Sequence, residues 1–232
     1  MFVLFERKID QLRDGICIVF DLDGTLVHTA PALAKAGNDL LYELNLQPVS
    51  VETYSTFIGG GIPKQVQKLL EFSNYSFSES LEKCIKKFKE FYYQDPLYGT
   101  SIFPNVKETL QILNNEYQNL AICTQKNERP ARFILKEFLL LEYFSGFAFG
   151  DSLDVLKPDP RMVQLATKNF VSDRLIYVGD SLTDSKTARK SDSTFVLFTE
   201  GYRKNSIAEL NPDYYFSEFS KLPDMIRYIQ QS

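Results

Sequence analysis

Six short apolar runs separated by helical patterns most strongly constrain the fold of this 232-residue chain. The first run, from Ile16 to Phe20, is too short for a helix and has the β-branched and aromatic bias of a buried strand. Strands that alternate with helices predict a mostly parallel sheet covered on both faces. The other five runs are residues 120–124, 146–150, 175–180, 194–198 and 213–216.

The stretch between Asp21 and the second run is far longer than the roughly 30 residues of a strand–helix–strand unit. Three helical patterns fill it, so we expect an inserted all-helical domain over residues 29–96, at the carboxyl edge of the sheet. Residues 1–28 and 97–232 would then form a Rossmann-like, three-layer α/β core with a mostly parallel sheet. The three patterns place apolar residues at Leu33, Leu40, Leu41 and Leu44, at Val66, Leu69, Leu70 and Phe72, and at Leu81, Ile85, Phe88 and Phe91.

Composition narrows the class of protein. A net charge of −4 and a pI near 5.2 argue against binding to nucleic acid or an anionic membrane, which needs a basic face. No apolar run approaches the length of a membrane span, and residues 1–14 become charged too early for a secretory signal. The three cysteines are an odd number, and two lie in strand-like runs, so we expect buried thiols in a reducing cytoplasm.

Polar residues follow four of the expected strands. Because ligands of open parallel sheets bind beyond the carboxyl ends of the strands, these side chains should meet in one crevice. Crowded carboxylates without a nearby His or Cys favour Mg²⁺, which can in turn bind a phosphate. Gly24 would allow a tight turn with backbone N–H groups free for phosphate oxygens. The residues are Asp21 and Asp23, then Thr124 and Gln125, then Lys157, then Asp180, Ser181 and Asp184.

These residues carry a resemblance to a known family. The ordered motifs "DLDGTL", Thr124, "KPDP" with Lys157, and "GDSLTD" resemble the four motifs of the haloacid dehalogenase (HAD) superfamily of phosphatases. The helical insertion after the first motif resembles the subgroup with a C1 cap. The segments "VGDSLTD" and "LFTEGY" are most similar to phosphoglycolate phosphatases and their close relatives.

The resemblance implies a role for each residue. Asp21 would be the nucleophile that forms an aspartyl-phosphate, and Asp23 the general acid and then the base. Thr124 would donate a hydrogen bond to the phosphate, and Lys157 would lie between the nucleophile and the phosphoryl group. Asp21, the backbone carbonyl of Asp23 and Asp180 would hold Mg²⁺, with Asp184 either weakly ligating or supporting from outside.

For several other residues, the sequence indicates a functional role less strongly. Gly60, Gly61 and Lys64 belong to a loop that either binds the distal end of the substrate or serves as a flexible hinge. Gln125 stands where asparagine is common in the family, which would alter neighbouring hydrogen bonds without removing activity. We expect His28 to be either a spectator or a residue that supports the site from outside, and not a base. Residues 200–203 are better explained as a plain surface loop than as the rim of the site.

The expected activity is Mg²⁺-dependent hydrolysis of a small phosphorylated metabolite such as 2-phosphoglycolate, by a monomer or homodimer. A sugar-phosphate mutase, a pyrophosphatase or a nucleotidase of the same superfamily stays open. A haloalkanoate dehalogenase is disfavoured because its chemistry has no need for an acid at Asp23. The alternative from another functional class is a binding or regulatory module without turnover. The complete set of expected site residues argues against this alternative.

Overall fold

The computed structural model describes residues 15–76 and 79–232. The prediction that residues 1–14 are not a secretory signal therefore lies outside the described residues. Six parallel strands form one sheet in the order β5-β4-β1-β6-β7-β8, which confirms the predicted Rossmann-like α/β fold. Each of the six predicted runs overlaps a strand of the sheet. The strands are β1 (Ile16–Phe20), β4 (Leu120–Cys123), β5 (Gly146–Ala148), β6 (Arg174–Gly179), β7 (Thr194–Phe198) and β8 (Tyr214–Phe216).

Both faces of the sheet are buried, because alternate residues of each strand point to opposite sides. In β1, Ile18 and Phe20 pack into one apolar cluster and Cys17 and Val19 into another. The first cluster includes residues of α6 (Val106–Tyr117), α7 (Glu128–Glu137) and α11 (Leu222–Gln231), and the second includes residues of α8 (Arg161–Thr167), α9 (Leu182–Lys190) and α10 (Ile207–Leu210). Short 3₁₀ helices span Leu141–Tyr143 and Phe219–Lys221.

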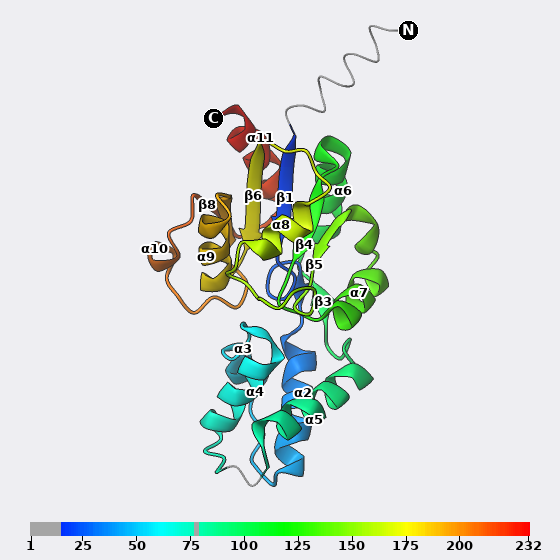
Figure 1. Ribbon diagram of the computed structural model, residues 1–232, viewed down its shortest axis with the longest axis vertical. Coiled ribbons are helices and arrows are strands. Elements are labelled where there is room, and N and C mark those ends of the chain that lie inside the picture. Colours follow the sequence, from blue (N-terminus) through cyan, green and yellow to red (C-terminus); the bar gives the residue numbers. More distant parts are fainter. Residues whose placement is uncertain (1–14, 77–78) are drawn as a thin grey trace, which may run out of the picture.

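The long insertion is helical and has an apolar cluster of its own. The cluster includes Tyr54, which is buried and stacks on Phe88 at 6.3 Å between ring centroids. Figure 1 shows these helices gathered together at one end of the sheet, on the side to which the chain leaves β1. They are α2 (Ala30–Glu43), α3 (Val51–Ser55), α4 (Gly61–Phe72) and α5 (Leu81–Gln94). The short α3, which Ser50 caps, has no counterpart among the three predicted patterns.

A small antiparallel pair stands where the chain enters and leaves these helices. Strand β2 (Val27–His28) pairs with β3 (Ser101–Ile102), a feature that sequence reasoning did not predict because each strand has only two residues. The two crossings of the chain are therefore held side by side. We refer to residues 29–100 between them as the helical segment.

The structure also bears on two predictions from composition, those for the cysteines and for membrane spans. Cys17, Cys84 and Cys123 are buried free thiols, and burial raises the pKa of Cys17 and of Cys123 to about 12. None of the helices in the described ranges combines the length and apolarity that a membrane crossing requires.

Candidate active site

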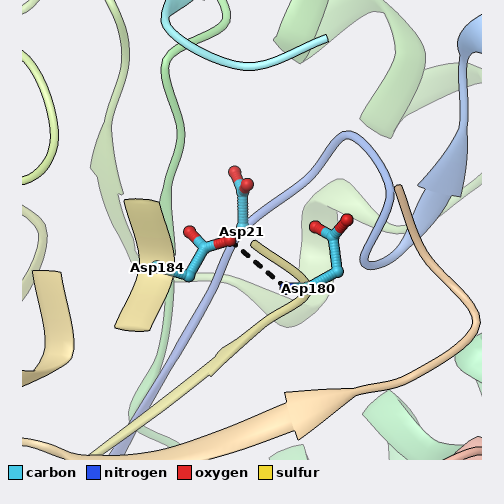
Figure 2. Close-up of side chains that lie close together, drawn as sticks. All are labelled: Asp21, Asp180 and Asp184. Carbon is cyan, nitrogen blue, oxygen red and sulfur yellow. Dashed lines mark hydrogen bonds between the residues drawn. The ribbon is translucent and has the colours of Figure 1, made fainter. Parts of the chain in front are cut away.

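Three aspartates meet where β1 and β6 end. Asp21 directly follows β1, Asp180 directly follows β6, and Asp184 lies in the first turn of α9. One carboxylate oxygen from each lies within 4.8 Å of the others. Figure 2 shows the carboxylates of Asp21 and Asp180 pointing to the same side, with Asp184 beside Asp21. The expected meeting of strand ends in one crevice is therefore observed for these residues.

Burial and mutual repulsion make negative charge costly at this cluster. Burial, together with the charge of Asp184, raises the pKa of Asp21 to about 7, although Lys157 opposes this shift. Burial and the charges of Asp184 and Asp21 raise the pKa of Asp180 well above its usual range. A cation at the cluster would remove this cost.

Asp184 is fully occupied by hydrogen bonds. Its Oδ1 accepts from Lys157 Nζ at 2.8 Å and from the Tyr177 hydroxyl at 3.3 Å. Its Oδ2 accepts from the Ser181 hydroxyl at 2.6 Å and from the backbone N–H groups of Asp180 and Ser181, which closes a capping box at the start of α9. Since a carboxylate offers about four lone-pair positions, Asp184 is better suited to position Lys157 than to bind an ion directly.

Lys157 is buried between two carboxylates. Its Nζ lies 3.0 Å from Asp21 Oδ1 and 2.8 Å from Asp184 Oδ1, and it also donates to the Tyr177 hydroxyl at 3.1 Å. Burial alone would lower the pKa of Lys157, but the charges of Asp184 and Asp21 raise it above the usual range. Lys157 is therefore a fixed positive charge beside the predicted nucleophile.

Asp23 is held by residues that sequence reasoning did not identify. Its carboxylate accepts hydrogen bonds from Lys126 Nζ at 3.0 and 3.2 Å and from Thr29 Oγ1 at 2.7 Å. Lys126 lies over the ring of Tyr92 on α5, with 4.8 Å between Nζ and the ring centroid. Burial would lower the pKa of Lys126, but the interactions with Asp23 and Tyr92 raise it. The sequence feature that could have identified Lys126 is its position, two residues after Thr124 at the end of β4.

Thr124 and Gln125 follow β4 as predicted. The Thr124 hydroxyl accepts from the Lys126 N–H at 3.2 Å, so its own proton remains available to a ligand. Gln125 forms a bridge between the sheet and the helical segment. Its Oε1 accepts from the Gly60 N–H at 2.6 Å, and its Nε2 donates to the backbone carbonyl of Lys157 at 2.7 Å.

Gly24 differs from its predicted role. Its N–H donates to the Val27 carbonyl at 2.9 Å, so it is not free for phosphate. The residue has a φ of +85°, and a Cβ there would lie 2.7 Å from Asp180 Oδ2 and from the Tyr202 ring. Glycine is therefore required at this position for the turn and for the close approach of Asp180.

The loop after β7 is part of the site, so the prediction of a plain surface loop was wrong. The Tyr202 N–H donates to Asp180 Oδ2 at 2.6 Å. The Tyr202 hydroxyl accepts from the N–H groups of Thr29 and Ala30 at the start of α2, which leaves its own proton for His28 Nδ1 at 3.0 Å. His28 thus interacts with Tyr202, and its burial lowers its pKa.

Two cavities adjoin these residues. The smaller, of about 60 Å³, is lined by site residues from the sheet and by Gly61 and Tyr92 of the helical segment. The larger, of about 380 Å³, is lined by Gly60 and Lys64 among others. The predicted residues that line the smaller cavity are Asp21, Asp23, Thr124, Gln125, Lys157, Asp180, Ser181 and Gly61.

Asp21 and Asp180 fit a divalent cation. Both offer carboxylate oxygens, the ligands that hard divalent cations prefer, at a buried cluster where burial and neighbouring carboxylates raise both pKa values. Among the described residues, Asp21 Oδ2 accepts no hydrogen bond, so it is free to ligate. The Asp23 carboxylate is directed to Lys126 and Thr29, and the contribution of its backbone carbonyl remains a prediction.

Comparisons with known proteins agree on one family. The family model for haloacid dehalogenase-like hydrolases matches residues 18–198. A phosphoglycolate phosphatase of Cereibacter sphaeroides (strain ATCC 17025) is 35% identical over 213 residues, which cover 91% of this chain and 98% of that protein. A phosphoglycolate phosphatase of Haemophilus influenzae is 37% identical over 213 residues, covering 88% and 95%. A crystal structure described as a predicted phosphoglycolate phosphatase from Haemophilus somnus 129pt is 30% identical, with a TM-score of 0.80, and covers 93% and 98%.

Proposed function

Because this chain belongs to the haloacid dehalogenase-like hydrolases, we propose that it is a Mg²⁺-dependent phosphatase that cleaves a small phosphomonoester through an aspartyl-phosphate on Asp21. The relatives named phosphoglycolate phosphatase make 2-phosphoglycolate the first substrate to test. The observation that carries the proposal is the small cavity, where Asp21, Asp23, Lys157 and Asp180 converge. This combination supplies a nucleophile, a proton carrier, a fixed cation and a metal ligand.

The first chemical step uses Asp21 and Asp23. An oxygen of Asp21 attacks phosphorus, and a P–O bond to Asp21 forms while the bond from phosphorus to the alcohol oxygen breaks. Asp23 gives its proton to the departing alkoxide, so the alcohol leaves neutral. Lys157 supports the transfer because its charge lies 3.0 Å from Asp21, next to the oxygens on which negative charge accumulates.

The second step restores the enzyme. Asp23, now a carboxylate, takes a proton from a water molecule that attacks the phosphorus of the aspartyl-phosphate. The bond between phosphorus and Asp21 breaks and inorganic phosphate leaves. Thr29 and Lys126 hold Asp23 in one orientation, which suits a group that acts first as an acid and then as a base.

Asp21 and Asp180 are the proposed Mg²⁺ ligands, with Asp184 in support through Lys157. The bound ion would neutralise the carboxylates and attract the phosphate. We further propose that residues 29–96 act as a cap domain on a core of residues 1–28 and 97–232, and that the cap excludes water during the reaction. The three free thiols support a reducing compartment such as the cytoplasm.

The test is phosphate release with Mg²⁺ across a panel of 2-phosphoglycolate, sugar phosphates, nucleoside monophosphates and pyrophosphate. Turnover should stop in EDTA, return with Mg²⁺, and be abolished in Asp21→Asn. Exposed Asp173, which has no ion pair within the described residues, provides the matched control Asp173→Asn. In Asp23→Asn the loss should be greatest for substrates with poor leaving groups.

The outcomes separate the candidates. Turnover retained in Asp21→Asn, after contamination is excluded, would refute the nucleophile assignment. Isomerised sugar phosphate with little free phosphate would indicate a mutase. Binding of Mg²⁺ and substrate without any turnover would indicate a regulatory module.

A further inference from the structure

A second, larger cavity adjoins the small one and is lined by positive charge. Its volume of about 380 Å³ is within the range of about 300–1,000 Å³ that is usual for ligand pockets, whereas about 60 Å³ for the small cavity is well below it. We call it the cationic cavity, because five lysine and arginine side chains line it besides Lys157. They are Lys64, Lys68, Lys186, Arg203 and Lys204.

No acidic side chain balances these five charges in the part of the chain that the structure describes. The lining of the cavity contains no Asp or Glu, and every ion pair described involves other lysines and arginines. Lys68 donates to the carbonyl of Phe57, and Arg203 to the carbonyls of Thr199 and Asn205. These partners are neutral, so they satisfy donors without cancelling charge. Such a concentration of cations is unusual in a chain with a net charge of −4.

The lysines also repel one another. Partial burial and the neighbouring charges of Lys68 and Lys64 lower the pKa of Lys204 to about 8. Burial and the charge of Lys64 lower the pKa of Lys68 in the same way. An anion bound among them would relieve this repulsion.

The charges come from both parts of the molecule. Lys64 and Lys68 lie one turn apart on α4 of the helical segment, whereas Lys186 is on α9 and Arg203 and Lys204 follow β7. The cationic cavity adjoins the small cavity, since several residues line both. The shared residues include Gly59, Gln125, Lys157, Ser181, Thr183 and Tyr202.

We propose that the cationic cavity is the substrate subsite that recognises a second anionic group, carboxylate or phosphate, on the part of the phosphomonoester that does not react. This inference rests on the proposed function, because it assigns a substrate class to the same site. A phosphoryl group in the small cavity would direct the remainder of the substrate toward Gln125 and the cationic cavity. Five cations can bind more charge than one carboxylate carries, so a phosphate there should bind more strongly than a carboxylate.

The test is a matched series of two-carbon substrates with increasing distal charge: ethyl phosphate, 2-phosphoglycolate and ethane-1,2-diol bisphosphate. We expect kcat/KM to rise at least about tenfold from the neutral compound to 2-phosphoglycolate and to rise again for the bisphosphate. Added NaCl should reduce these ratios, because exposed charges are screened. Equal kcat/KM values across the series would overturn the proposal.

Variants connect the preference to the cavity. Lys68→Met and Lys204→Met should each reduce the ratio of bisphosphate to ethyl phosphate about fivefold or more, whereas Lys83→Met should not, because exposed Lys83 on α5 does not line the cavity. Lys204 is the safer variant, since it is exposed and lies in a loop. An unchanged ratio in both variants would also overturn the proposal.

A binding measurement separates failure of this inference from failure of the proposed function. Calorimetry with inorganic pyrophosphate needs no turnover. If no substrate is hydrolysed but Lys204→Met weakens pyrophosphate binding at least fivefold and Lys83→Met does not, the anion site stands and the catalytic proposal falls. If inorganic phosphate binds through Lys204 while the three substrates have equal kcat/KM, the cavity holds a free anion and is not a substrate subsite.

Discussion

Replacing Gln125 with asparagine tests whether the contact between the sheet and the helical segment contributes to catalysis. The glutamine amide spans from the Gly60 N–H, at 2.6 Å, to the Lys157 carbonyl, at 2.7 Å. Asparagine is shorter by one methylene and cannot reach both partners. Each lost hydrogen bond costs about 0.5–1.5 kcal/mol net. Loss of both would cost about 2 kcal/mol, which corresponds to a roughly 30-fold lower kcat/KM if the bridge is present in the transition state.

The assay is steady-state phosphate release, measured together with thermal unfolding. Gln125→Glu provides a graded comparison, because a carboxylate can still accept from the Gly60 N–H but cannot donate to the Lys157 carbonyl. Its kcat/KM should therefore differ from those of the wild type and of Gln125→Asn. The matched control is Gln67→Asn on α4, since Gln67 is exposed and its side chain donates to Glu71 on the same helix at 2.8 Å.

The reasoning would be refuted if Gln125→Asn kept kcat/KM within about twofold of the wild type. A lower melting temperature with normal kcat/KM would likewise assign the bridge to stability alone. Solution scattering adds a readout that does not depend on catalysis. If the bridge holds the two parts together, Gln125→Asn should have the larger radius of gyration.

Three further predictions concern stability. Asp184→Asn should cost about 3 kcal/mol and also lower kcat, because it removes the buried partner of Lys157 at 2.8 Å. Tyr202→Phe should lower the melting temperature by roughly 4–8 °C. The reason is that the N–H groups at the start of α2 lose the hydroxyl that accepts from them, at a cost of about 2 kcal/mol. Exposed Tyr228 provides the control Tyr228→Phe. In EDTA, Asp21 should contribute a loss of about 2 kcal/mol of stability between pH 5.5 and 8, because its folded-state pKa is raised to about 7 and it binds more of its proton in the folded than in the unfolded protein over this range.

Each of these predictions has a contrary result. Unchanged melting of Asp184→Asn would mean that Lys157 does not need this partner. Equal melting temperatures of Tyr202→Phe and Tyr228→Phe would remove the cap assigned to Tyr202. The same pH dependence in Asp21→Asn as in the wild type would mean that another group is responsible. The Asp21 contribution is fully present below about pH 4 and is lost as the pH rises through about 7.

The sheet and its carboxyl-end residues could be predicted from the sequence because both follow local rules. A buried strand has an apolar pattern that is visible in a few residues, and parallel strands place their carboxyl ends at one edge. Asp21, Thr124 and Asp180 each directly follow such a pattern, so their neighbourhood could be inferred before any contact was known. The six observed strands confirm this part of the analysis.

Residues that act through distant partners could not be predicted in this way. Gly24 carried a correct turn signal, but only the structure shows that its N–H is used by Val27. Lys126 is one of 26 lysine and arginine residues, and its sequence position does not reveal that Asp23 lies 3.0 Å away. Tyr202 lies in a loop, where sequence patterns give no register and therefore no partner.

Lys126, Tyr202 and Gln125 share a position that suggests why they matter. Each joins a residue of the proposed reaction to the helical segment through a single side chain. Movement of the helical segment would therefore alter the catalytic groups and the cationic cavity together, and binding of a distal anion would be coupled to the alignment of the nucleophile. The three links run from Asp23 through Lys126 to Tyr92, from Asp180 through Tyr202 to Thr29 and Ala30, and from Lys157 through Gln125 to Gly60.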